Sequence, residues 1–159
     1  MSSEDILRIA SEAQRLLDIV GAVFQENSID LPSRQYLAVG ELGGTAHDKE
    51  QVTVSFGNMS DGLPGSRGAN PQACAASYMA SFSVEIVRCT PQMTGGGYGP
   101  GEPPAPSVIS DYSVSRYIDS WLLVRVAQRF SGGKSEYTVT TGEDSGAMQA
   151  IILSVNTGV

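Results

Sequence analysis

The chain has 159 residues, of which 41% are hydrophobic, and 17 acidic against 10 basic side chains give it a formal net charge of -7. This length suits one domain, which buries about two-thirds of the surface that its unfolded chain exposes. The acidic balance and the lack of a basic run argue against direct nucleic-acid binding. No segment has the roughly 18 consecutive apolar residues of a membrane span, and the first residues lack a signal-peptide pattern, so we expect a soluble protein made inside the cell.

The first half of the chain predicts one helix and two strands. In residues 3–27, apolar side chains recur at three- and four-residue steps with charged side chains on the other side, as in an amphipathic helix. Residues 35–42 and 50–56 read as a strand and its hairpin partner, joined by a glycine-containing turn. Residues 58–73 are expected to form a loop, and loops this long in a compact domain are usually either functional or mobile.

The second half predicts a central strand, a long loop, a helix and two further strands. Polar and apolar residues alternate over residues 80–89, and the proline at position 91 ends that strand because it cannot donate to a ladder. A loop rich in glycine and proline then leads to residues 107–130, the most apolar helical segment. Residues 135–141 and 148–156 read as the last two strands.

This order of elements predicts the fold class. Short turns between consecutive strands favour antiparallel pairing, while the loop and helix after the central strand allow a crossover. We therefore expect residues 1–159 to form a single α+β domain. Its mixed, mostly antiparallel sheet has about five strands, with two main helices packed on one face.

No pattern in the sequence predicts a catalytic, metal or cofactor site. His47, the only histidine, stands in a turn beside Asp48, and neither a GxSxG motif nor an activated cysteine accompanies it. One histidine and two separated cysteines do not make a zinc site, and no carboxylates follow the spacing of a calcium loop. Cys74 and Cys89 lack CxxC spacing, so we expect two buried free thiols, with a disulfide as the alternative.

Two glycine-rich segments imitate nucleotide-binding loops. Residues 132–135 read GGKS, but Gln128 stands where a phosphate-binding loop needs glycine. A helix is also expected before this segment and a strand after it, the reverse of the phosphate-loop order. Residues 95–101 lack the GxGxxG spacing, so neither segment is expected to bind a nucleotide.

The second helix carries apolar side chains on more than one of its sides. Packing in the core explains most of them, and the alternative is a helix held between its own sheet and a neighbouring subunit. On the first interpretation, Trp121→Ala costs about 3–5 kcal/mol through lost burial and cavity formation. The side chains concerned are Tyr117, Ile118, Trp121, Leu122, Val124 and Val126.

Over nearly the whole chain, the order of the predicted elements and the composition of the segments resemble those of the tail terminator proteins of long-tailed bacteriophages, especially those that infect actinobacteria. The marks are a long first helix, a hairpin, a strand that ends in VEIVRCTP, a loop rich in proline and glycine, a helix that carries Asp119-x-Trp121, and a closing pair of strands punctuated by glycine. The strand end Arg88-Cys89-x-Pro91 is the most distinctive of them.

The resemblance implies a structural virion protein with no catalytic residues. It would form a hexameric ring on the last ring of major tail protein, stop growth of the tail tube and join the tail to the head-side connector. DNA would pass through the acidic lumen without specific binding, and no membrane is involved. The protein would be made in the host cytoplasm and reside in the tail or neck of the virion.

We expect the ring to form through heterologous contacts made by a sheet edge and a helix, with the long loops contacting partners. The candidate contact residues are Asn58, Asp61, Arg67 and Gln72 in and around the first long loop and Tyr98 in the second.

Two alternatives stay open. The nearer is another head-tail joining protein, a head-closure or tail-completion factor with partners on the head side. The more distant is a small α+β enzyme or ligand-binding domain that uses a pocket around His47, Asp48 and Tyr98.

Overall fold

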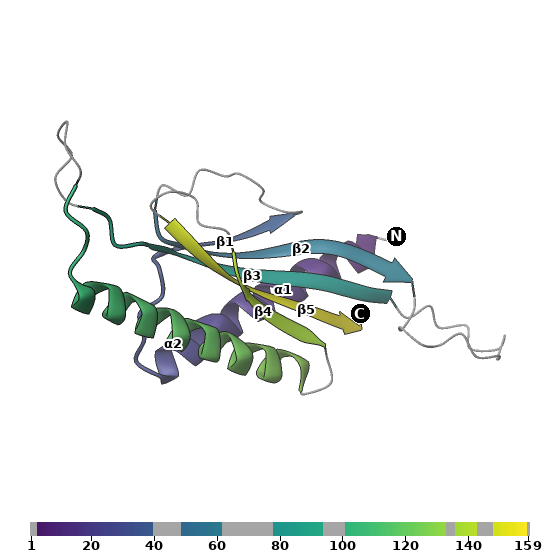
Figure 1. The fold of residues 1–159 in the computed structure, drawn as a ribbon. Helices are drawn as coiled ribbons and strands as arrows, with labels where there is room; N and C mark the ends of the chain where they lie inside the picture. The colour runs from purple at the N-terminus through teal and green to yellow at the C-terminus, as the bar shows by residue number, and fades with distance from the viewer. Residues whose placement is uncertain are drawn as a thin grey trace.

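The computed structural model describes residues 3–39, 49–61, 78–93, 101–132, 136–142 and 148–158. These residues form two helices and a five-stranded sheet, an α+β arrangement (Figure 1). In chain order the elements are α1 (Ser3–Glu26), β1 (Arg34–Val39), β2 (Gln51–Asp61), β3 (Tyr78–Cys89), α2 (Pro106–Ser131), β4 (Tyr137–Thr141) and β5 (Met148–Gly158).

The sheet is mixed and mostly antiparallel, as predicted. Its strand order is β1-β2-β3-β5-β4, and every neighbouring pair is antiparallel except β1 and β2. The predicted hairpin between the first two strands is therefore wrong, because their register runs in parallel from Arg34↔Gln51 to Val39↔Phe56. A parallel pair requires the chain to return to the starting end of the first strand, which a tight turn cannot do.

Both helices cover the same face of the sheet and enclose the main core (Figure 1). The alternation along β3 places Phe82, Val84 and Ile86 on this face, where all three are fully buried. The Phe82 ring lies 5.8 Å from the ring of Phe56 and 6.1 Å from that of Phe130 of α2. Other fully buried core residues are Leu16, Val20 and Phe24 of α1, Leu122, Leu123 and Val126 of α2, and Ile151, Leu153 and Val155 of β5.

Both helices end where the local sequence predicts. After α1, Ser28 takes a positive φ of 56°, and the Ile29 amide donates to the Phe24 carbonyl at 3.1 Å, closing the last turn. Helix α2 begins at Pro106, which has no amide hydrogen to leave unsatisfied at this position. It ends at Gly132, whose φ of 59° suits a residue without a side chain.

The first long loop begins later than predicted, because β2 extends to Asp61. A register irregularity between Phe56 and Met59 interrupts the ladder, and pairing then resumes at Met59↔Ala80. The prediction ended this strand at Phe56 because the apolar alternation stops there. Backbone pairing continues beyond it, since the hydrogen-bond ladder does not depend on side-chain pattern.

Cys89 also departs from its prediction. Its thiol is free, but it is exposed and not buried. Cys89 is the last residue of β3 and follows Arg88, which faces the helices, so the pleat directs it to the other face at the end of the sheet. Cys74 lies outside the described residues.

Candidate functional site

The predicted contact residues fall into two groups. Asn58 is exposed on β2 beside the register irregularity, and Asp61 is the last residue of that strand. Arg67, Gln72 and Tyr98 lie outside the described residues. The structure therefore places the first two near one end of β2 and leaves the proposed contacts of the long loops as predictions.

The pocket proposed for an enzyme also lies outside the described part of the chain, since His47, Asp48 and Tyr98 all do. Among the described residues, no group of three or more histidine, cysteine or acidic side chains is placed to hold a metal ion. None of the described helices combines the length and the apolarity of a membrane span.

An apolar surface lies on the side of α2 that faces away from the sheet. Val114, Tyr117 and Trp121 are 55%, 76% and 53% exposed, and their three- and four-residue spacing places them on one helix side. We call these three residues the α2 outer face. The expectation that Trp121 is a core residue is therefore wrong. The buried side of the helix is centred on Asp119, Leu122 and Val126, roughly half a turn away.

The composition of α2 is unusual for a helix surface in contact with water. The segment Pro106–Ser131 contains no lysine and no glutamate, and its only acidic residues are Asp111 and Asp119. The guanidinium carbon of Arg125 lies 5.0 Å from the centre of the Trp121 ring, within the range of a cation–π contact. Protein interfaces are enriched in tyrosine, tryptophan and arginine and depleted in lysine and glutamate, and this surface has the same bias.

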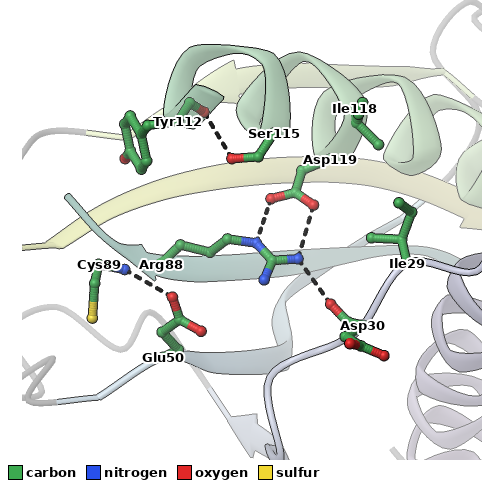
Figure 2. Close-up of a pocket in the computed structure, with 9 residues that line it drawn as sticks. All are labelled: Ile29, Asp30, Glu50, Arg88, Cys89, Tyr112, Ser115, Ile118 and Asp119. Carbon is green, nitrogen blue, oxygen red and sulfur yellow. Dashed lines mark hydrogen bonds and ion pairs between the residues drawn. The ribbon is translucent and has the colours of Figure 1, made fainter. Parts of the chain in front are cut away.

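Three charged side chains meet between the buried side of α2 and the end of the sheet, and Figure 2 shows two of them, Arg88 and Asp119. The Nε and Nη2 atoms of Arg88 donate to the two carboxylate oxygens of Asp119 at 2.7 and 3.0 Å, a bidentate ion pair. The Nη1 atom of Arg116, one helical turn before Asp119, donates to the same carboxylate at 3.1 Å. We call these residues the Arg–Asp–Arg cluster.

The cluster joins four parts of the fold. Arg88 belongs to β3, while Arg116 and Asp119 belong to α2. Arg88 Nη2 also donates to the Asp30 carbonyl after α1 at 3.0 Å, and Arg116 Nη2 donates to the Gln149 carbonyl of β5 at 3.1 Å. These contacts fix the position and the rotation of α2 on the sheet, and with them the direction in which its outer face points.

The electrostatics of the cluster favour charged side chains. Burial disfavours the charged guanidinium of Arg88, but hydrogen bonding and attraction from Asp119 outweigh burial and raise the pKa of Arg88 above its ordinary value. Burial lowers the pKa of Arg116, as does the nearby charge of Arg88, although Tyr112 and Asp119 oppose them. Both side chains stay protonated near neutral pH, because the ordinary pKa of an arginine lies far above neutrality.

A shallow pocket of about 340 Å³ opens beside the cluster, lined partly by Arg88, Asp119 and Glu50 (Figure 2). Glu50 accepts a hydrogen bond from the backbone amide of Cys89 at 3.2 Å. Two hydroxyl groups of this lining also donate hydrogen bonds: Tyr112 Oη donates to the side-chain oxygen of Gln149 at 3.0 Å, and Ser115 Oγ donates to the Tyr112 carbonyl at 2.7 Å.

Sequence reasoning named Arg88 and Asp119 without predicting their contact, and it did not single out Arg116. Arg88 and Asp119 stand in the two motifs that carry the resemblance, but a motif does not say which residues touch. The available signal is that Arg88 continues the alternation of Phe82, Val84 and Ile86 and so belongs to the core face of β3. An arginine on a core face requires a buried acidic partner.

No family model matches the chain, and no curated protein matches it either.

Proposed function

We propose that this protein is a phage tail terminator. Six copies form a ring that caps the tail tube, stops its growth and joins the tail to the head-side connector. The observation that carries this proposal is the α2 outer face, where Val114, Tyr117 and Trp121 are exposed on a helix without lysine or glutamate. A contiguous exposed apolar surface on a soluble domain marks a contact with another molecule.

Two further features support the proposal. The order of helices and strands, together with the Arg88-Cys89-x-Pro91 and Asp119-x-Trp121 motifs, resembles that of tail terminators. The net charge of -7 suits a ring whose lumen lets DNA pass without specific binding. On this proposal the partners are major tail protein below the ring and a connector or head-closure protein above it, in the neck of the virion.

Native mass spectrometry of the purified protein over a range of concentrations, with negative-stain images of the same samples, tests the proposal. We expect a species of six chains that images as a ring. The protein is then mixed with tail tubes assembled from the major tail protein of the same phage, and we expect it to cap one end of each tube. A protein that remains monomeric and leaves both tube ends bare would contradict the proposal.

A pull-down with the same proteins distinguishes a tail terminator from the nearest alternative, another head-tail joining protein. A tail terminator binds the major tail protein in a pull-down, while a head-closure or tail-completion factor binds only the head-side connector. Binding to the connector alone would show that the protein is a head-closure or tail-completion factor and not a tail terminator.

A further inference from the structure

We infer that neighbouring copies of this protein join edge to edge, with strand β4 of one copy paired antiparallel to strand β1 of the next copy. The inference rests on the proposed function, because it states how one copy binds the next in the ring. Within the described sheet these two strands are the edges, and no described strand lies on the outer side of either (Figure 1). The outer side of an edge strand presents amide and carbonyl groups that can pair with another chain.

The directions of the backbone groups on β4 follow from two hydrogen bonds at its ends. The Asn156 amide donates to the Glu136 carbonyl at 3.1 Å, and the Gly142 amide donates to the Ala150 carbonyl at 2.9 Å. The register between these bonds is continuous, and in an antiparallel pair alternate residues point toward and away from the partner strand. The even-numbered residues of β4 therefore bond to β5. The outward residues of β4, whose backbone groups point away from β5, are Tyr137, Val139 and Thr141.

The same alternation, followed across the sheet, assigns the backbone groups of β1. Because even-numbered residues of β5 bond to β4, its odd-numbered residues bond to β3, and continuous registers carry the alternation through β3 to residues 51–56 of β2. The Cys89 amide, which donates to Glu50 just before β2, points to β2 as this alternation requires. Even-numbered residues of β2 then bond to β1, each to the two neighbours of its parallel register partner. The outward residues of β1 are therefore Gln35, Leu37 and Val39.

The outward residues of both strands carry their side chains on the helix-covered face of the sheet. Val139 packs against the main core, and the register partner of Leu37 is the core residue Val54. In an antiparallel pair, residues directly opposite each other place their side chains on the same face. Pairing of β4 with β1 of the next copy therefore continues the sheet with the helices of both copies on one face.

The directions of the two edge strands also match this arrangement. Strand β1 is parallel to β2, and three antiparallel steps lead from β2 through β3 and β5 to β4, so β1 and β4 run in opposite directions. Rotation about a ring axis parallel to the strands preserves these directions, so β4 meets the next copy's β1 antiparallel. A join between unlike edges is heterologous and can close into a ring, and closure leaves neither edge unpaired.

One register matches the side chains of the two edges. Its facing pairs are Tyr137 with Val39, Val139 with Leu37, and Thr141 with Gln35. Val39 is 87% exposed, Leu37 is 40% exposed and Tyr137 is 37% exposed in the single chain. An aromatic ring beside a β-branched side chain is a favourable cross-strand pair, and the three facing pairs form about six hydrogen bonds, two for each pair. A shift of two residues in either direction leaves Val39 or Tyr137 without an apolar partner.

The composition of β4 and the spacing of the helices both allow the join. All residues of β4, YTVTT, are β-branched or aromatic, the types that suit strands. The strand has no lysine, no proline and no register irregularity, features by which natural edge strands avoid pairing. Five strands about 4.8 Å apart span about 24 Å, and two helices packed about 10 Å apart need about 20 Å, so the helices of adjacent copies do not collide.

Cysteine cross-linking tests this pairing. In a background with Cys74→Ser and Cys89→Ser, one variant carries Val139→Cys and another carries Leu37→Cys. The Cα atoms of a facing, hydrogen-bonded pair lie about 5.5 Å apart, within the range of a disulfide. After oxidation of the assembled protein, an equimolar mixture of the two variants should give covalent dimers on a denaturing gel, while each variant alone should give none. A chain with both substitutions should give covalent products of up to six chains.

Proline substitutions test whether backbone hydrogen bonds hold the join. Val139→Pro and Leu37→Pro each remove an outward-pointing amide that forms no ladder bond within its own copy, a position at which edge strands tolerate proline. Val139→Ala and Leu37→Ala are matched controls that shorten the side chain and keep the amide. We expect each proline variant to raise the concentration for half-maximal assembly at least about tenfold above its alanine control. Circular dichroism verifies folding, and Thr141→Pro with Thr141→Ala replaces the Val139 pair if Val139→Pro does not fold.

The outcomes separate this inference from the proposed function. If Val139→Cys alone gives covalent dimers, two copies of β4 pair about a two-fold axis and the inference is wrong. If rings form but the mixture gives no covalent dimers, or if each proline variant assembles like its alanine control, the inference is wrong while the tail terminator proposal stands. If the unmodified protein does not assemble, alone or on tail tubes, the proposed function fails and this inference fails with it.

Discussion

Replacement of Asp119 by asparagine removes the negative charge at the centre of the Arg–Asp–Arg cluster with almost no change in volume. Asp119 is 1% exposed and accepts three hydrogen bonds from two arginines. Asparagine keeps only one oxygen that can accept these hydrogen bonds. Its amide nitrogen would point a donor at the arginine N–H groups, which can only donate. Arg116, which is 6% exposed and already has an unpaired Nε, would then carry an uncompensated charge.

The expected loss follows from the burial of the cluster. Removal of one partner from a buried ion pair costs about 3–5 kcal/mol, because the remaining charge stays buried. The side chain of Arg88 is 17% exposed beside the pocket and can bind water, while that of Arg116 is only 7% exposed. We therefore expect Asp119→Asn to lower the free energy of unfolding by about 3 kcal/mol, near the lower end of that range.

Urea denaturation followed by circular dichroism measures this loss. Asp111→Asn is the matched control, since Asp111 is an exposed acidic residue of the same helix, and we expect a change within about 0.5 kcal/mol. Equal shifts for the two variants, or a loss below about 1 kcal/mol for Asp119→Asn, would refute the view that this buried charge fixes α2 on the sheet.

An apolar replacement of the whole cluster distinguishes charge from packing. A buried ion pair replaced by apolar residues of similar volume is often neutral or stabilising. The triple variant Arg88→Met, Arg116→Met, Asp119→Leu should therefore be more stable than Asp119→Asn and approach the stability of the unmodified protein. A triple variant less stable than Asp119→Asn would show that the bonds to the Asp30 and Gln149 carbonyls matter more than the central charge.

Three further predictions concern stability, each measured by urea denaturation. Phe82→Ala should cost about 3–5 kcal/mol, because its fully buried ring contacts two others, and a cost below 2 kcal/mol would contradict this packing. Trp121→Ala should cost only about 1–2 kcal/mol in the monomer, because half of the side chain is exposed; a loss equal to that of Phe82→Ala would place it in the core. Gly132→Ala should cost about 1–2 kcal/mol, because its φ of 59° strains any side chain, and an unchanged midpoint would argue against a left-handed helix end.

Local sequence pattern predicted most of the elements of this fold. The three- and four-residue spacing of apolar residues located both helices to within one residue at their described ends. The alternation over β3 located the central strand and its core face. These features depend on neighbours along the chain, so they can be read from the chain itself.

The direction of strand pairing could not be read in this way. The alternation in β1 and β2 is the same whether the two strands run parallel or antiparallel, because the side-chain period is two in both arrangements. The path of the connection decides between them. The glycines at positions 43 and 44 favour a hairpin and hence antiparallel pairing, but the observed register is parallel.

The orientation of α2 was decided by tertiary structure alone. One of its apolar sides carries Leu122 and Val126, and another carries Tyr117 and Trp121, so the periodicity of the sequence does not select which side is buried. Asp119 lies on the first side, together with these buried apolar residues, and pairs with an arginine 31 residues earlier in the chain. The sequence by itself determined the elements and the chemistry of their sides. Which side became the core and which became an exposed surface was decided when the helix packed on the sheet, because only there can the charges on the buried side find the partners that compensate them.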